Sequence, residues 1–255
     1  MIQKSDNLDL KYKSAVKYYE NKEYIKASAL FEELIPILKG QADAEKAQYY
    51  YSYCQYYMQQ LVLSAYYFKK FYETFPRSEL AEEAYYMHCI SLYEDSPEYQ
   101  LDQTNTKQAL DAIQIFLERF PKTRYLEDCN GIVDKLILKL EMKAYNQAKL
   151  FYKMRDYRAC VITFENLIKD FPSSKYLEEA YFLKLASQYS YANISIDTKK
   201  KDRYQSAIDF YYLFLDKYPS SKFLKEAEKT YESIQTKLAE LDAPHKNGWW
   251  DWLLG

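Results

Sequence analysis

Four aromatic–proline pairs recur along the chain and constrain its fold more than any other feature of the sequence. Proline cannot continue a helix, because its nitrogen has no proton to donate and its ring collides with the preceding turn. Two residues after each proline stands a serine or threonine, which can accept a hydrogen bond from the exposed amides of a following helix. Each pair therefore marks one helix ending and another beginning. The pairs are Phe75-Pro76, Phe120-Pro121, Phe171-Pro172 and Tyr218-Pro219.

A second regularity precedes each proline. A small side chain lies twelve residues before it, and a bulky one lies eight residues before it. This spacing puts both on one helix face, where the small residue lets a partner helix approach closely. The first hairpin repeats the pattern without a closing proline, at Ala27 and Phe31. The small and bulky residues of the other copies are Ser64 and Phe68, Ala109 and Ile113, Cys160 and Phe164, and Ala207 and Tyr211.

Paired helices at a fixed period are typical of tetratricopeptide repeats. Successive prolines lie 45, 51 and 47 residues apart, so the repeats are expanded. Two insertions in the turns of the third and fifth hairpins, roughly 94–104 and 193–203, and a long helix over about 124–153 explain the expansion. The sequence predicts an all-α fold, a right-handed α-solenoid of about five hairpins with a C-terminal capping helix near 221–241.

We expect three parts in this array. Residues 1–120 hold the first three repeats, 121–241 hold the fourth and fifth repeats with the capping helix, and 242–255 form a Trp-rich tail. The Lys199-Lys200-Lys201 run lies within the second insertion beside acidic residues, and we interpret it as a solvated loop.

Composition excludes several classes of function. The 35 basic and 37 acidic residues nearly cancel, so the net charge of −2 provides no long-range attraction to nucleic acid or anionic lipid. No run of apolar residues is long enough to cross a bilayer. The two histidines and four scattered cysteines form no metal-ligand pattern, and no catalytic set or cofactor motif occurs. We expect a protein that is not an enzyme and has no metal or cofactor, with its cysteines in packing positions such as Cys129 and Cys160.

The first helix of each hairpin lines the concave face of such a solenoid. On the first two hairpins this face is rich in tyrosine, whose flat ring and polar tip suit extended polypeptide. Packing between helices is the alternative for these rings, and a core or rim position is the alternative for His88. Chaperone-type clamps hold a terminal carboxylate with Lys and Asn, which these positions lack, so the pattern favours an apolar groove. The predicted groove residues are Tyr12, Val16, Tyr19, Tyr49, Tyr53, Tyr56 and Tyr57, with Tyr85 and His88 from the third hairpin.

The ends of the chain differ from the repeats. Residues 1–6 lack the apolar core of a secretory signal. Two interpretations remain: a cytosolic protein, or a protein from which a leader has been removed. The tail carries three tryptophans, each able to bury on the order of 200 Å². Docking on a partner or on the chain's own surface is favoured over interfacial insertion. The docking residues are Trp249, Trp250 and Trp252.

With the repeats laid out, the chain resembles the BamD (YfiO) family, the tetratricopeptide lipoproteins of the outer-membrane β-barrel assembly (BAM) machine. The resemblance covers roughly residues 8–235. Its distinctive stretches are 95–104, which leads into 109–113, and 145–172 with its long first helix. The aromatic richness is similar to that of a Bacteroidetes-like branch.

The resemblance implies a non-enzymatic scaffold at the periplasmic face of the outer membrane. It implies that the C-terminal repeats bind the POTRA domains of BamA and the N-terminal repeats face unfolded outer-membrane proteins, with other BAM subunits as further partners. The membrane would be reached only through a lipidated N-terminal cysteine, which this chain does not contain. Another periplasmic tetratricopeptide adaptor, for example one of the Tol–peptidoglycan system, is the alternative.

Overall fold

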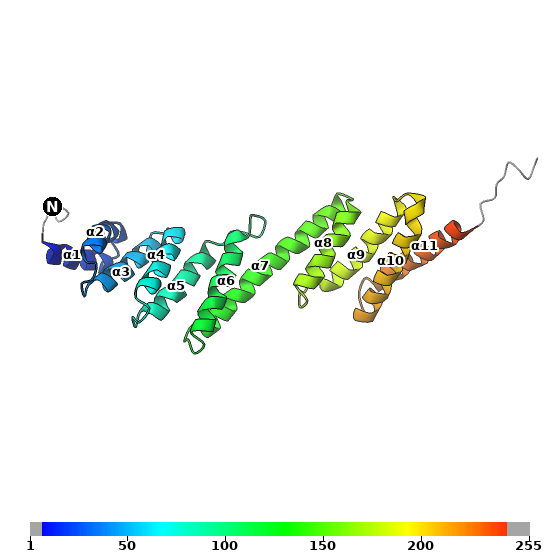
Figure 1. The fold of residues 1–255 in the computed structure, drawn as a ribbon. Coiled ribbons are helices and arrows are strands. Elements are labelled where there is room, and N and C mark those ends of the chain that lie inside the picture. Colours follow the sequence, from blue (N-terminus) through cyan, green and yellow to red (C-terminus); the bar gives the residue numbers. More distant parts are fainter. Residues whose placement is uncertain (1–6, 244–255) are drawn as a thin grey trace, which may run out of the picture. The chain divides into compact units, whose positions relative to one another are not determined.

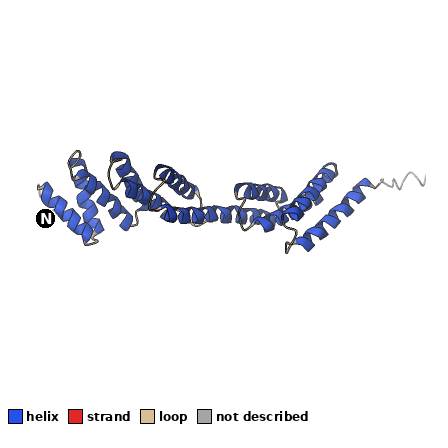
Figure 2. Ribbon diagram, turned by 90° about the horizontal axis from the view of Figure 1, so that it is seen from below, coloured by secondary structure: helices blue, strands red, loops and turns tan. Residues whose placement is uncertain are grey.

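The computed structural model describes residues 7–243, and these residues form eleven α-helices with no strand among them (Figures 1 and 2). Five hairpins follow one another, each made of an odd-numbered helix and the next even-numbered one, and α11 follows the last. The predicted all-α repeat of five hairpins with a C-terminal helix is confirmed. The helices are α1 (Leu8–Glu20), α2 (Tyr24–Ile37), α3 (Ala44–Tyr57), α4 (Leu61–Thr74), α5 (Ala81–Glu94), α6 (Thr104–Arg119), α7 (Leu126–Lys153), α8 (Tyr157–Asp170), α9 (Leu177–Asn193), α10 (Asp197–Lys217) and α11 (Leu224–Asp242).

The connections between hairpins share one length. Six residues separate each even-numbered helix from the next odd-numbered one, including the first connection, which has no aromatic–proline pair. In the other four, the aromatic residue caps the helix, as where Phe75 N donates to Phe71 O at 2.8 Å. Proline follows this cap at once, so the helix stops there. The connections are 38–43, 75–80, 120–125, 171–176 and 218–223.

Three of the four hydroxyls that follow a proline link the new helix to the preceding hairpin. Ser221 Oγ accepts from Phe223 N at 3.0 Å, as the sequence predicts. The same hydroxyl also donates to Glu178 Oε1 at 2.6 Å, at the start of the preceding odd-numbered helix. Thr123 makes the equivalent bond to Glu82 at 2.6 Å. Ser78, Thr123 and Ser221 therefore hold the new helix against the hairpin before it.

The small and bulky pairs lie in the core as predicted. Ala109, Cys160 and Ala207 are fully buried, and so are the bulky Phe68 and Phe164. All four cysteines are buried and unpaired. Their packing role is therefore confirmed by their positions.

The two predicted insertions have different structures. The first forms the loop between α5 and α6, where Lys139 Nζ of α7 donates to Ser96 Oγ at 2.8 Å. The second is mostly helical, so the predicted loop around Lys199-Lys200-Lys201 is wrong. Helix α10 begins at Asp197, whose charge suits the positive end of a helix, and Lys200 pairs with it at 2.9 Å. No glycine or proline stands there to stop the helix.

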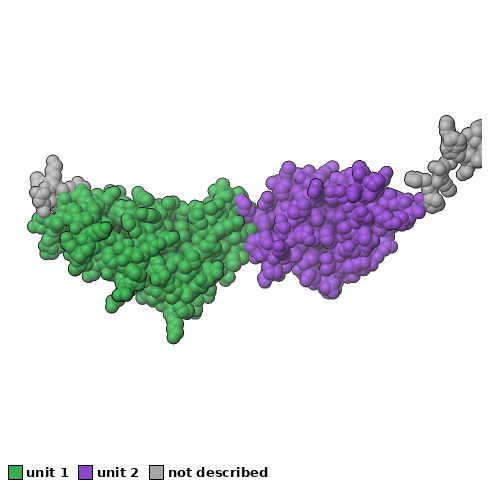
Figure 3. Space-filling view, in the orientation of Figure 1, with its two compact units in different colours: residues 1–140 green, residues 141–255 purple. Residues whose placement is uncertain are grey.

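The chain divides into two compact units, residues 1–140 and 141–255 (Figure 3). The division falls inside α7, whereas the sequence placed a boundary between residues 120 and 121. The reason is the length of α7. Its first half contributes Cys129 and Leu136 to the core of the first unit, and its second half contributes Tyr145 and Ala148 to the core of the second. Within residues 7–243, no helix combines the length and apolarity that crossing a bilayer requires.

Candidate functional site

The tyrosines predicted on the first two hairpins pack against one another. Tyr19 of α1 lies 4.7 Å from Tyr50 of α3, measured between ring centroids, and 6.5 Å from Tyr57. Tyr57, at the end of α3, stacks on Tyr24 of α2 at 4.5 Å. Edge-to-face and offset pairs of this kind add to the stability that burial alone provides. The rings therefore join the first two hairpins as well as forming a surface.

Tyr12 and Val16 lie at the edge of the first core cluster. The Tyr12 ring meets Phe31 edge to face at 6.5 Å, and Val16 is half-buried in the same cluster. Burial, with the nearby Asp43 carboxylate, raises the pKa of Tyr12 to about 12. Both residues thus serve packing within the first hairpin and expose only part of their surface.

Tyr49 and Tyr53 of α3 converge on one carboxylate of the next hairpin. Their hydroxyls donate to Glu83 Oε1 at 2.7 and 2.6 Å, and Arg124 Nη2 donates to the other oxygen of Glu83 at 3.2 Å. Burial is the main cause that raises the pKa of both phenols, and the hydrogen bonds to Glu83 add to it. The two hydroxyls are therefore fixed donors.

The remaining predicted residues divide by exposure. Tyr56 is half-buried and donates to Glu94 Oε1 at 2.6 Å, and the side chain of Tyr57 is 45% exposed. Tyr85 is buried, where it stacks on Tyr72 at 4.4 Å. His88 is also buried, and its Nδ1 lies 2.8 Å from the carbonyl oxygen of Ala65. Tyr85 and His88 therefore lie inside the third hairpin's packing.

A cleft opens beside Tyr57, with a volume of about 540 Å³. Its walls come from the start of α2 and the end of α3, including Tyr24, Ile25 and Met58. Ile25 is 77% exposed, and Val62 at the start of α4 is 67% exposed. An exposed apolar side chain such as Ile25, next to an aromatic pair and a cleft, is typical of surfaces that bind other proteins.

The described residues suit contact and offer little for catalysis. No group of three or more His, Cys, Asp or Glu side chains among residues 7–243 could hold a metal ion. Tyr19, Tyr49, Tyr53 and Tyr56 all have pKa values raised by burial, so they remain protonated and do not act as bases or nucleophiles. Trp249, Trp250 and Trp252 of the predicted docking tail lie outside the described residues.

The sequence did not indicate the role of Glu83. It lies at the start of α5, and Glu179 holds the same place in α9, seven residues after a proline. Burial alone would raise the pKa of Glu179, but hydrogen bonds from Tyr145 and Lys149 of α7 outweigh it, so the pKa is lowered. In both units this carboxylate receives donors from the preceding odd-numbered helix. The available signal in the sequence was the recurrence of an acidic residue seven positions after each of the four prolines.

Removing both hydroxyls in a Tyr49→Phe/Tyr53→Phe variant should lower the free energy of unfolding by about 2 kcal/mol, because Glu83 loses two donors. Urea unfolding followed by circular dichroism measures the change. Tyr66→Phe is the matched control, since the Tyr66 ring is 56% exposed on α4. An equal loss in both variants would contradict the role given to Glu83.

His88 makes stability depend on pH. Burial lowers its pKa to about 4, well below the ordinary value of 6.5. The unfolded chain therefore binds a proton more readily than the folded one between these values, and stability falls as pH falls. From about pH 7.5 to about pH 5 the His88 contribution should decrease by about 2 kcal/mol.

Thermal unfolding at the two pH values measures this loss. A His88→Gln variant should show a smaller decrease on acidification than the wild type. His245→Gln, which removes the other histidine, should keep the full decrease. If the His88 and His245 variants respond alike to pH, the assignment to His88 is wrong.

Comparison with known proteins assigns the chain to a family. The sequence matches the family described as YfiO, outer membrane lipoprotein, over residues 5–148 and 139–244. It is 21% identical to the outer membrane protein assembly factor BamD of Rickettsia prowazekii over 224 residues, or 88% of this chain and 85% of the relative. It is 24% identical to the BamD of Caulobacter vibrioides over 131 residues, which are 51% of this chain and 43% of that relative. The match thus spans less than half of the Caulobacter protein's length.

Proposed function

The chain belongs to the YfiO family of outer membrane lipoproteins, and on that basis we propose that it is an outer-membrane protein assembly factor. The observation that carries the proposal is the extent of the family match, which includes helices of both compact units. Both relatives described above are named as assembly factors. The protein is an adaptor and not an enzyme, in keeping with the family.

We propose that the first unit binds unfolded outer-membrane proteins. The surface formed by Tyr24, Ile25 and Tyr57 supports this, because it combines exposed apolar side chains with an open cleft. Aromatic anchors beside a cleft contribute much of the energy of protein binding, with little entropy to lose. Such a surface tolerates different sequences, because it contacts side chains through area and shape.

We propose that the second unit, α8 to α11 with the second half of α7, attaches the chain to the POTRA domains of BamA. The family resemblance supports this division of roles. The chain would then work at the periplasmic face of the outer membrane, close to the barrel insertase, with other BAM subunits as further partners. A lipid anchor at the N-terminus would hold it there.

The proposal is tested by isolating the affinity-tagged chain from membranes of its own organism in mild detergent. We expect BamA to copurify and depletion of the chain to lower the level of outer-membrane proteins. Recovery of Tol–peptidoglycan proteins in place of BamA, with normal levels of outer-membrane proteins after depletion, would favour the alternative adaptor function.

A double variant tests the binding surface separately. Ile25→Ser/Tyr57→Ala should weaken binding of an unfolded barrel-protein peptide about tenfold, because it removes an exposed anchor and one wall of the cleft. Binding of BamA should be unchanged. Tyr212→Ala, which truncates a 53% exposed ring on α10 of the second unit, is the control. If the folded double variant binds the peptide as tightly as the wild type does, the proposal that this surface binds unfolded proteins is wrong.

A further inference from the structure

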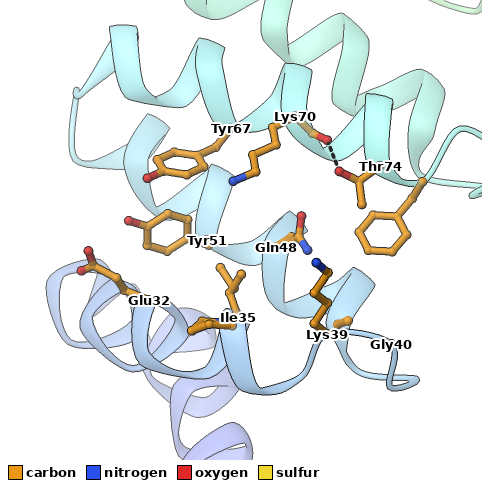
Figure 4. A pocket seen from close by; sticks show the side chains of 12 residues that line it. Glu32, Ile35, Lys39, Gly40, Gln48, Tyr51, Tyr67, Lys70 and Thr74 are labelled. Atoms are coloured by element: carbon orange, nitrogen blue, oxygen red, sulfur yellow. Dashed lines mark hydrogen bonds between the residues drawn. The ribbon is translucent and has the colours of Figure 1, made fainter.

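A second and larger cavity lies between the first two hairpins, with a volume of about 600 Å³ (Figure 4). Its walls come from α2, α3, α4 and the connection 38–43. Ile35 and Phe75 make part of its apolar lining, and the rings of Tyr51 and Tyr67 close one side at 4.7 Å from each other. Cavities of this size hold small organic molecules.

This cavity exists because the first connection departs from the repeat. All five connections have six residues, so each residue of one connection can be compared with the residue at the same position in the others. Where the other four have proline, the first has Lys39. The first residue of α3 is the small Ala44, and the fifth is Gln48. Both line the cavity together with Lys39.

The corresponding place in the second unit is much narrower. A pocket of about 260 Å³ lies there, lined by residues that hold the same positions. Pro172 replaces Lys39, Leu177 replaces Ala44, and Tyr181 replaces Gln48. Between the second and third hairpins the position of Gln48 is occupied by Tyr85, whose ring is buried. Larger side chains therefore fill the corresponding place in the second unit, and at the second junction the Tyr85 ring takes the place of Gln48.

Two lysines extend into this cavity from opposite walls. Lys70 of α4 points toward Tyr51 and Tyr67, and Lys39 points toward Gln48 (Figure 4). Neither ammonium has a carboxylate partner among residues 7–243, although Lys70 lies 5.8 Å from the Tyr66 ring. The one acidic side chain of the lining, Glu32, lies beside Tyr51, on the side away from Lys39.

From this combination we propose that the cavity binds an anionic amphiphile, a molecule with one carboxylate or phosphate group on an apolar chain or ring. The anion would lie between Lys39 and Lys70, where two ammonium groups complement its charge and the Gln48 amide can donate to it. The apolar part would cover Ile35, Phe75 and the tyrosine pair. This site is separate from the cleft beside Tyr57 and does not depend on the proposed assembly function.

The first test compares octanoate and octyl phosphate with the neutral octanamide, each titrated into the full chain by calorimetry. We expect both anions to bind at least tenfold more tightly than octanamide and to weaken as salt is raised. The two anions distinguish a carboxylate from a phosphate as the preferred group. Equal binding of octanoate, octyl phosphate and octanamide would overturn the proposal, because charge would then have no part in recognition.

Two variants place the binding in this cavity. Lys39→Gln/Lys70→Gln should reduce octanoate affinity at least tenfold and leave octanamide affinity unchanged. Ala44→Leu/Gln48→Tyr, which introduces the side chains of the second unit's narrow pocket, should abolish binding of both ligands. Lys217→Gln changes a lysine of that narrow pocket and should have no effect.

Wild-type octanoate affinity in the double-lysine variant would contradict the proposal. That variant changes two exposed side chains, so it tests the site even where the cavity-filling variant does not fold. Circular dichroism establishes that each variant is folded.

Discussion

Replacing Phe164 with alanine should lower the free energy of unfolding by about 4 kcal/mol, a large loss for a single truncation. Phe164 is fully buried in the core of the second unit, together with Cys160, Leu167 and Ala180. Alanine removes the ring and leaves a cavity that the surrounding helices fill only in part. Urea unfolding of the second unit measures the effect.

The matched control is Ile162→Ala, two residues away on the same helix. The Ile162 side chain is 49% exposed, so its truncation should cost well under half as much as that of Phe164. Phe164→Leu should lie between them, because it keeps part of the buried volume. A similar loss for Phe164→Ala and Ile162→Ala would show that the bulky member of the repeated pair has no special place in the core.

A proline at Leu138 should have the second largest effect, about 3 kcal/mol or more, because it breaks a helix from within. Leu138 is near the middle of α7 and 38% exposed, so the loss of its side chain matters little. The ring collides with the preceding turn and removes one backbone hydrogen bond. Since α7 contributes to the cores of both units, we expect the units to unfold in separate transitions.

Leu138→Ala removes the same side chain without disturbing the backbone, and it should retain nearly the stability of the wild type. Unfolding followed by far-ultraviolet circular dichroism compares the two variants. If Leu138→Pro unfolds at the same urea concentration as Leu138→Ala, continuity of α7 does not matter for stability.

The sequence predicts the fold well because its strongest signals are local. The proline in Phe171-Pro172 can only end a helix. The spacing of Cys160 and Phe164 places both side chains on one face of the helix before this proline. The long helix up to Lys153 follows from the same reasoning, since no proline or glycine interrupts its later part. The loop predicted at residues 193–203 was wrong because insertion length does not reveal conformation.

The site was harder to predict because it depends on contacts between hairpins. The sequence predicts a row of tyrosines on α3, but it does not show that Tyr49 and Tyr53 converge on Glu83, which lies at least thirty residues away. Tyr53 and Tyr85 are both buried, whereas Tyr57, predicted on the same face, is 45% exposed. Which tyrosines are exposed is decided by the volume of their neighbours in other helices.

The burial of all four thiols has a consequence for experiments on the living cell. Thiols react as exposed thiolates, and burial raises the pKa of Cys54 to about 12. Folding of the described helices therefore needs no oxidant, and an alkylating dye should modify the chain only while a helix pair is open. Cys160 lies in the second unit, and the other three cysteines lie in the first. Peptide mapping of the modified cysteines over time would therefore measure how often each unit opens, without any engineered label.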